Sequence, residues 1–408
     1  MGSETNARDR LKRRAWLGFV SSVIAVAALA ATACGDGGSE ATSAPATSTI
    51  AAEEALGERL ASQLQDVLDA AVADPDVFPG AILRVSGPGL GTWTGTAGMG
   101  EIASRTPMRP DDKFRAGSIM KTFISVVVLQ LVEEGAFSLD DPLPAVLPES
   151  SYSRFPDGDE ITVRMLLNHT SGLPEWLSPA VIGEIVANPG KVWDVTEFLD
   201  LSAAQPPSFS PGSGYAYSNT DYNVLGLIIE GATDRSWREE VAARVIGPLD
   251  LPGTLLPEPG DVSIPGNYAR GYGASADALV DFTGVDPSMA GAAGGGALVT
   301  SALDLARFLG AVLSGELFEK EETLQEMLAF IDAPGEGGQV GYGLGLQRYL
   351  LPGGIEVIGH LGSTAGYVAF MGYLPASSMS IVAALNSQGD PTPVLLPAVE
   401  ILTGPTSQ

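Results

Sequence analysis

The chain has 408 residues, of which 45% are hydrophobic, so it can bury the core of one large domain or of two medium ones. Its formal net charge of −27 would repel a phosphate backbone, which disfavours binding to nucleic acid. The single cysteine excludes an intramolecular disulfide, and with two histidines and no Cys/His cluster a zinc site is not expected.

The first 34 residues are predicted to be an export signal. Basic residues up to Arg13-Arg14 precede an apolar run over residues 15–33, and the small residues Ala31-Thr32-Ala33 stand directly before Cys34. A positive flank, an apolar stretch and a small-residue cleavage site follow in this order in export signals. The segment resembles a bacterial lipoprotein signal, in which the new N-terminal cysteine carries lipid. We therefore expect an exported protein that is anchored in the membrane by lipid on Cys34.

Other interpretations of this segment stay open. The apolar run is close to the length that spans a membrane, and cleavage without lipidation would release a soluble protein. Ala31 stands where the lipoprotein pattern prefers leucine, and Arg13-Arg14 weakly resembles a twin-arginine export signal. Residues 35–52 are rich in glycine, serine, threonine, alanine and proline, which predicts a flexible linker.

The first elements after the linker are a helix and a hairpin. Residues 53–73 carry apolar side chains at helical spacing, and residues 80–100 form two extended stretches around Gly87-Pro88-Gly89, which is typical of a β-hairpin. A helix over residues 118–134 is apolar on most sides. Such a helix is expected to lie buried at the centre of a protein.

The rest of the chain predicts a helical middle part and then strands. The clearest helices of the middle part cover residues 162–167, 222–231, 237–245 and 301–313. The strands of the last part, followed by a closing helix over 393–402, cover residues 342–349, 355–360, 367–374 and 379–385. We predict an α+β fold over residues 53–402, with an antiparallel sheet built from both chain ends and flanked by helices. A mostly helical lobe is inserted at about residues 140–335.

The strongest chemical signal is Ser118 with Lys121 at the start of the apolar helix. Residues three apart share one helix face, so the amine of Lys121 can approach the hydroxyl of Ser118. A serine hydroxyl needs a neighbouring base to become a nucleophile, and burial lowers the pKa of a lysine toward that role. Alternatively, Ser118 caps a core helix and Lys121 is solvated, but an idle charge among isoleucine, phenylalanine and valine residues would be costly.

Two further motifs contain groups that suit acyl transfer. In Tyr217-Ser218-Asn219, the phenol can shuttle a proton, and the amide can hold both the lysine and a substrate carbonyl. In His360-Leu361-Gly362-Ser363, Gly362 lets a substrate backbone approach, and the following N–H can point at an oxyanion. Each motif alone also fits a structural role, as a surface turn around Asn219 and a hydrogen-bonded core histidine at His360.

Together and in this order, the three motifs resemble those of the serine β-lactamase and penicillin-binding protein superfamily. The Tyr-x-Asn motif is similar to that of the branch with class C β-lactamases, D-alanyl-D-alanine carboxypeptidases and esterases. The resemblance covers about residues 55–400 and extends to residues 166–174, 294–298 and 342–345. It implies the β-lactamase/transpeptidase-like fold and no metal or cofactor. We expect a monomer that acts on a small molecule or a peptide.

The resemblance also implies a mechanism. Ser118 attacks a carbonyl and forms an acyl-enzyme, which water then hydrolyses. Lys121 and Tyr217 handle the proton, and which of them is the base stays open. Asn219 positions the substrate, whereas His169 lies in a structural turn and has no catalytic role.

In the third motif, the resemblance implies that the N–H groups of Ser118 and Ser363 form the oxyanion hole. His360 takes the place of a lysine, which weakens the fixed positive charge at neutral pH. Leu361 replaces a threonine whose hydroxyl helps to hold the substrate carboxylate, and leucine offers no hydrogen bond. We therefore expect hydrolysis of small esters, amides or D-alanyl peptides. D-alanyl-D-alanine carboxypeptidase activity and weak β-lactamase activity are the alternatives.

Functions of other classes have less support. The sequence lacks the Gly-x-Ser-x-Gly motif of the α/β-hydrolases. A non-catalytic penicillin-binding sensor would not need the complete set of Ser118, Lys121, Tyr217 and Asn219. In a purely structural surface lipoprotein, the three motifs would have arisen by chance.

Overall fold

The computed structural model describes residues 56–75, 77–274 and 279–404. The predicted export signal, the linker and the lipidation site Cys34 lie outside these residues. Within the described ranges, no helix combines the length and the apolar character that are needed to cross a membrane.

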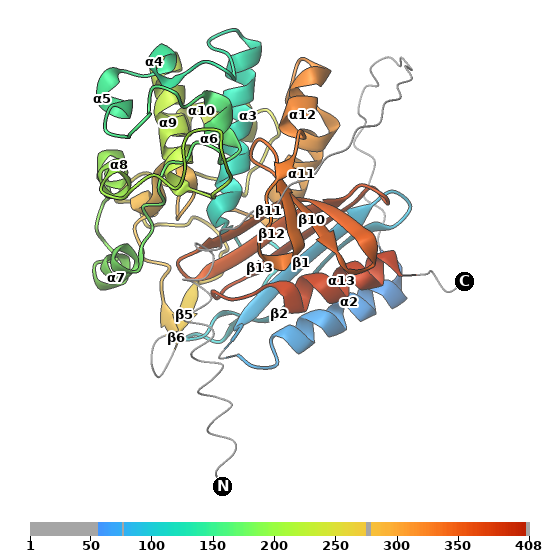
Figure 1. Cartoon of the computed structure of the whole chain (residues 1–408). Helices are drawn as coiled ribbons and strands as arrows, with labels where there is room; N and C mark the ends of the chain where they lie inside the picture. The colour runs from blue at the N-terminus through green and yellow to red at the C-terminus, as the bar shows by residue number, and fades with distance from the viewer. Residues whose placement is uncertain (1–55, 76, 275–278, 405–408) are drawn as a thin grey trace, which may run out of the picture.

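Both ends of the domain contribute to one large antiparallel sheet (Figure 1). Its nine strands lie in the order β3-β2-β1-β13-β12-β11-β10-β9-β8. The strands are β1 (Gly80–Gly87), β2 (Gly91–Glu101), β3 (Thr106–Pro107), β8 (Ile331–Asp332), β9 (Gln339–Tyr342), β10 (Gln347–Leu351), β11 (Ile355–Thr364), β12 (Tyr367–Leu374) and β13 (Met379–Leu385). Because β1 pairs with β13, with Ala81 opposite Leu385, the two ends of the domain join within the sheet.

The sheet buries both of its faces. In β1, Ala81, Leu83 and Val85 belong to one cluster of buried side chains, and Ile82 belongs to another. Successive side chains of a strand point to opposite faces, which explains this period of two. Helices α2 (Glu58–Ala71) and α13 (Thr392–Thr403) cover the first face, and α3 (Met120–Glu133) and α11 (Ala302–Ser314) cover the second.

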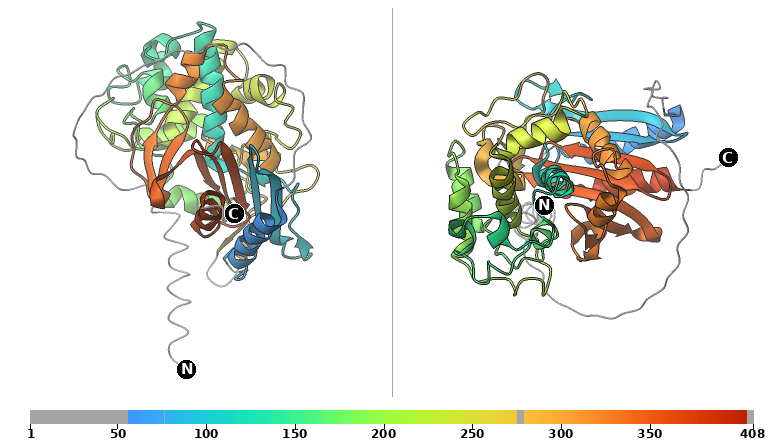
Figure 2. Two further views of the ribbon diagram at one scale, coloured as in Figure 1. Left: turned by 90° about the vertical axis from the view of Figure 1, so that its right-hand side faces the viewer. Right: turned by 90° about the horizontal axis from the view of Figure 1, so that it is seen from above.

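A mostly helical lobe lies beyond α3, on the side of the sheet opposite to α2 and α13 (Figure 2). Its helices are α4 (Leu143–Val146), α5 (Glu149–Tyr152), α6 (Val163–Leu167), α7 (Pro179–Ala187), α8 (Val195–Ala203), α9 (Asn219–Thr233) and α10 (Trp237–Val241), and α12 (Glu321–Met327) stands near α11. Side chains cap several of these helices; for example, the hydroxyl of Thr162 accepts a bond from the N–H of Met165. The predicted α+β fold class is confirmed.

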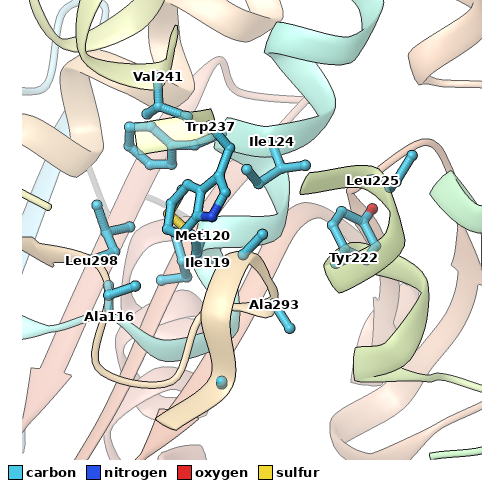
Figure 3. Packing of buried hydrophobic residues seen from close by; sticks show 14 of the residues in the cluster. Ala116, Ile119, Met120, Ile124, Tyr222, Leu225, Trp237, Val241, Ala293 and Leu298 are labelled. Atoms are coloured by element: carbon cyan, nitrogen blue, oxygen red, sulfur yellow. The ribbon is translucent and has the colours of Figure 1, made fainter. Parts of the chain in front are cut away.

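Helix α3 is buried where the helical lobe meets the sheet. Ile119, Met120 and Ile124 pack in one apolar cluster with Trp237 and side chains of the neighbouring segments (Figure 3). In the same stretch of α3, the ring of Phe123 stacks on that of Phe308, with centroids 3.6 Å apart. Apolar contact on most sides therefore holds the start of α3 in place, as its sequence predicts.

One strand was predicted wrongly. The expected strand over residues 342–349 is interrupted by a tight turn over residues 343–346, because β9 ends at Tyr342 and β10 begins at Gln347. Gly345 adopts a φ of 85°, which residues other than glycine rarely adopt. The N–H of Gly343 donates to the carbonyl of Leu346 at 2.8 Å and closes the turn. The two glycines, which look like part of an extended run in the sequence, make this reversal.

Candidate active site

Ser118 lies in a single 3₁₀ turn, η1 (Gly117–Ile119), which leads directly into α3. The end of β11 packs tightly against this turn. A Cβ atom at Gly362 would lie 1.8 Å from the carbonyl oxygen of Ala116, and one at Gly117 would lie 2.8 Å from the backbone nitrogen of Ser363. The two glycines thus bring the backbone of Ser363 beside Ser118, as the predicted oxyanion hole requires.

Lys121 lies one helical turn after Ser118 and is fully buried. Its Nζ atom is 3.1 Å from Ser118 Oγ, 2.6 Å from Asn219 Oδ1 and 2.7 Å from the carbonyl oxygen of Ala293. Burial lowers the pKa of Lys121 to about 7, although Glu175 and Asp221 act in the opposite direction. A large fraction of Lys121 is therefore neutral at neutral pH and able to accept a proton.

The second motif reaches Ser118 from the start of α9. The hydroxyl of Ser218 caps this helix by accepting a bond from the N–H of Thr220 at 3.2 Å, so that Asn219 is its first residue. Tyr217 forms a side-chain hydrogen bond with Ser118, and its ring lies 4.8 Å from Lys121 Nζ. Burial raises the pKa of Tyr217 well above its usual value, so the phenol keeps its proton.

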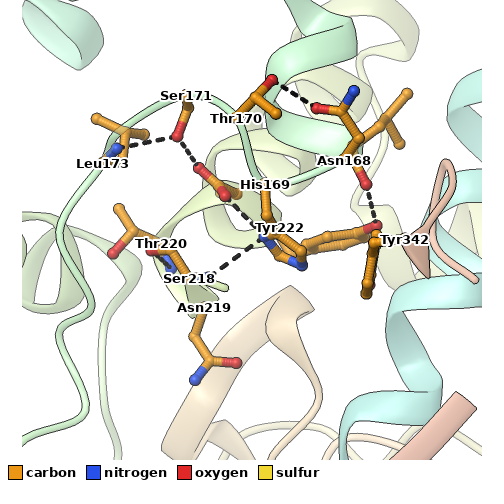
Figure 4. Close-up of polar contacts among 12 residues, drawn as sticks. Asn168, His169, Thr170, Ser171, Leu173, Ser218, Asn219, Thr220, Tyr222 and Tyr342 are labelled. Atoms are coloured by element: carbon orange, nitrogen blue, oxygen red, sulfur yellow. Dashed lines mark hydrogen bonds and ion pairs between the residues drawn. The ribbon is translucent and has the colours of Figure 1, made fainter. Parts of the chain in front are cut away.

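His169 contacts two residues of the second motif, Tyr217 and Ser218. Its ring lies 4.3 Å from that of Tyr217, and its Nδ1 atom is 2.7 Å from Asp221 Oδ2 and 3.3 Å from the N–H of Ser218 (Figure 4). Burial, together with the charge of Lys121, lowers the pKa of His169 well below its usual value, so the ring is neutral. A φ of 60° at His169 makes the structural turn that the sequence predicts, and the structure adds its contact with Tyr217.

His360 is fully buried and is neutral. Its Nδ1–H donates to the carbonyl oxygen of Leu361 at 2.6 Å, and Nε2 is 3.0 Å from the hydroxyl of Tyr342. Burial lowers the pKa of His360 to about 3, with a further contribution from Lys121. Its ring centroid lies 6.4 Å from that of Tyr217.

The side chain of Leu361 lies on the other face of the sheet from α3, and its role in substrate binding stays a prediction. Leu361 packs against the cluster under α2 and α13, on the face of the sheet that points away from α3. The N–H of Leu361 donates to Gln347 Oε1 at 2.7 Å, and its carbonyl oxygen accepts a hydrogen bond from His360 Nδ1. Because side chains alternate along β11, His360 and Leu361 cannot face the same side.

Two groups in the site were missed by the sequence analysis. The carbonyl oxygen of Ala293, at the end of the 3₁₀ segment η3 (Pro287–Ala293), accepts a hydrogen bond from Lys121. Every residue has a backbone carbonyl, so the sequence does not indicate which one takes part in a site. Glu175 Oε2 accepts both the backbone N–H and the side-chain Nδ2–H of Asn219, at 2.8 and 3.0 Å. In the sequence, only its place directly after the 166–174 stretch could have drawn attention to it.

The structure thus brings Ser118, Lys121, Tyr217 and Asn219 together, with the backbone of Ser363 beside them. This set can take a proton from a serine hydroxyl and stabilise a developing oxyanion. No group of histidine, cysteine and acidic side chains within the described part of the chain is arranged to hold a metal ion. The role of each residue in catalysis stays a prediction.

Comparison with known proteins assigns the chain to a family. The family model described as Beta-lactamase matches residues 67–402. Esterase EstB of Burkholderia gladioli is 34% identical over 216 residues, which are 50% of this chain and 54% of that protein. Penicillin-binding protein 4* of Bacillus subtilis is 29% identical over 48% of this chain and 42% of its own length. The chain spans about half the length of these curated relatives.

Solved structures match over more of the chain. A D-stereospecific amidohydrolase from Streptomyces has 34% sequence identity and a TM-score of 0.74, over 82% of this chain and 97% of that chain. The D-amino acid amidase from Ochrobactrum anthropi, in complex with D-phenylalanine, has 28% identity and a TM-score of 0.72, over 85% and 98%. The match of the family model over most of the described residues shows that this chain belongs to the beta-lactamase family.

Proposed function

We propose that the protein hydrolyses small esters or amides through an acyl-enzyme on Ser118. The observation on which this depends is the position of Lys121, whose buried Nζ atom lies 3.1 Å from Ser118 Oγ. Because burial lowers the pKa of Lys121 to about 7, the neutral amine is available as a base near neutral pH. The relatives that include an esterase and an amidohydrolase support the same chemistry.

The two candidates for proton transfer take different roles in this proposal. Lys121 accepts the proton of the Ser118 hydroxyl while Oγ attacks the substrate carbonyl. Tyr217 keeps its proton in the resting protein, since burial raises its pKa, and it suits protonation of the leaving group. The proton that Lys121 took from Ser118 then passes to the phenolate, so that Lys121 and Tyr217 return to their starting states. The N–H groups of Ser118 and Ser363 stabilise the oxyanion, and a water molecule later hydrolyses the acyl-enzyme.

The proposed substrates are uncharged around the scissile bond. His360, which stands at the position of a cationic residue in the third motif, is buried and neutral. Arg348, on the neighbouring strand, lies over the ring of Phe330 and 4.0 Å from Glu356, so it does not replace that charge. A substrate carboxylate would lose water without gaining a cationic partner, which weakens binding of penicillins and of peptides with a free D-alanyl carboxylate.

A substrate panel tests this preference. We expect kcat/KM for short p-nitrophenyl esters or a neutral D-amino acid amide to exceed that for a chromogenic cephalosporin at least about tenfold, as expected for one unpaired buried charge. A peptide that ends in D-Ala-D-Ala should also be slower than the neutral substrates. Efficient hydrolysis of the cephalosporin or of the peptide, with little esterase or amidase activity, would replace this proposal by a β-lactamase or a carboxypeptidase.

We also propose export with a lipid anchor on Cys34, on the basis of the basic, apolar and small-residue segments before that cysteine. The protein should fractionate with membranes, and the intact mass of the mature form should include a lipid on Cys34. Cys34→Ala should stop processing at this site and lipidation, whereas the control Ser39→Ala should change neither. Unchanged processing and membrane association in Cys34→Ala would contradict the proposal. The expected monomeric state stays a prediction.

A further inference from the structure

Glu175 is a carboxylate close to the reacting groups that the proposed mechanism does not use. It is half-buried in the segment between α6 and α7. Its Oε1 atom accepts the N–H of Leu177 at 2.7 Å, and its Oε2 atom accepts the backbone and side-chain N–H groups of Asn219. Burial raises the pKa of Glu175, but these N–H donors and the charge of Lys121 oppose the rise. The ionised form satisfies all three donors, since it only accepts hydrogen bonds.

These contacts determine which way the amide of Asn219 points. Its Oδ1 atom accepts from Lys121 Nζ at 2.6 Å, while its Nδ2 atom donates to Glu175. The side chain of Asn219 extends away from the group around His169 (Figure 4). Because an asparagine amide has nearly the same shape after a half-turn, packing alone cannot choose between its two orientations. A carboxylate on one side accepts only from the NH₂ group, so it selects the observed orientation.

The orientation matters because a neutral lysine has two N–H donors and one lone pair. Ala293 O and Asn219 Oδ1 can only accept, so together they use both N–H groups of neutral Lys121. The lone pair is then left for the third neighbour, the hydroxyl of Ser118. With the amide reversed, the NH₂ group of Asn219 would donate to this lone pair, and Lys121 could no longer take the serine proton.

We propose that Glu175 is a positioning residue that holds the amide of Asn219 so that the lone pair of Lys121 faces Ser118. This inference rests on the proposed function and extends it by a residue that touches none of the reacting atoms. It predicts an effect on nucleophile activation rather than on substrate binding. It also predicts that the effect depends on the match of donors and acceptors between residues 175 and 219.

The variant Glu175→Gln tests the proposal. Glutamine has one accepting oxygen for the three N–H donors around residue 175, so it cannot satisfy Leu177 and Asn219 together, and it selects the observed orientation of the Asn219 amide less strongly. We therefore expect kcat to fall at least about tenfold, with a smaller change in KM. The rate of labelling by a fluorophosphonate, which reports activation of Ser118 without a choice of substrate, should fall by a similar factor. Loss of the carboxylate should also lower the pKa of Lys121 and shift the acid limb of the kcat/KM profile to lower pH.

A double-variant cycle separates this effect from general damage. Asn219→Asp alone puts two carboxylates face to face, but Glu175→Gln with Asn219→Asp restores a donor opposite an acceptor and leaves an acceptor for Lys121. The double variant should therefore be labelled faster than Asn219→Asp, which is the non-additivity of coupled residues. Glu175→Asp, which keeps the charge, should lose less activity than Glu175→Gln. Glu184→Gln, the same change at an exposed carboxylate on α7, should have wild-type rates.

The outcomes are distinguishable. If the wild type is labelled and Glu175→Gln shows the same rate and acid limb, the positioning role is wrong and the proposed function stands. If the double variant is no faster than Asn219→Asp, or if only the melting temperature changes, Glu175 is merely structural. Should Glu175→Gln fail to fold, equal labelling of Glu175→Asp and wild type would overturn the proposal, and slower labelling would support it. An unlabelled wild type would overturn both the proposed function and this inference.

Discussion

Replacing Ser118 by alanine is expected to abolish hydrolysis of every acyl substrate. The loss should be about 10⁴-fold or more, because removal of a nucleophile leaves only the binding and oxyanion contributions to the rate. The fold should remain intact, since the Ser118 side chain is only partly buried and its contacts are to Lys121 and Tyr217. Initial rates on a p-nitrophenyl ester measure the loss, and thermal unfolding checks the fold.

Covalent labelling identifies the nucleophile directly. A fluorophosphonate should add once to the wild type at Ser118, as read by intact mass and peptide mapping, and should not add to Ser118→Ala. The control Ser213→Ala removes an exposed hydroxyl from the loop before Tyr217 and should label like the wild type. Wild-type turnover by Ser118→Ala would eliminate this residue as the nucleophile. A folded wild type that is never labelled would favour a non-catalytic binding protein.

The second large effect is expected at Lys121. Replacing it by methionine keeps most of the apolar stem in its buried site but removes the base, so kcat/KM should fall at least about 100-fold. In the wild type, kcat/KM should decrease below about pH 7, because the amine, whose pKa burial lowers to about 7, becomes protonated and can no longer accept a proton. Far below this pH the decrease should approach tenfold per pH unit.

The pH profile of Lys121→Met is the deciding measurement. The limb near pH 7 should vanish in this variant, since the group that titrates is gone. Lys320→Ala, which removes an exposed lysine at the start of α12, should keep both the rate and the limb. A Lys121→Met protein with near wild-type kcat/KM and the same limb would assign the base to another group, with Tyr217 as the first candidate.

The spacing of apolar residues along the sequence was enough to predict the helix and the strands that carry the candidate site. The period-two runs of the last part predict β12 and β13 with the bounds that the structure has, and the apolar run after Ser118 predicts the buried helix α3. The spacing of Ser118 and Lys121 predicts their contact, because residues three apart on a helix meet whatever surrounds them. The turn around Gly345 was missed, since alternation of apolar residues does not reveal where a chain reverses.

Contacts between distant segments were decided only by the tertiary structure. Lys121 forms hydrogen bonds with Asn219 and Ala293, which are both far from it in the sequence. Glu175, which lies in a segment without a recognisable chemical motif, forms a hydrogen bond with Asn219. The face on which Leu361 lies depends on which side of β11 the helices cover, which the sequence around it does not state. The pKa of Lys121 likewise results from burial by several segments at once. Motif residues could therefore be found from the sequence by itself. The protonation and hydrogen bonding that give them a function arise from long-range packing.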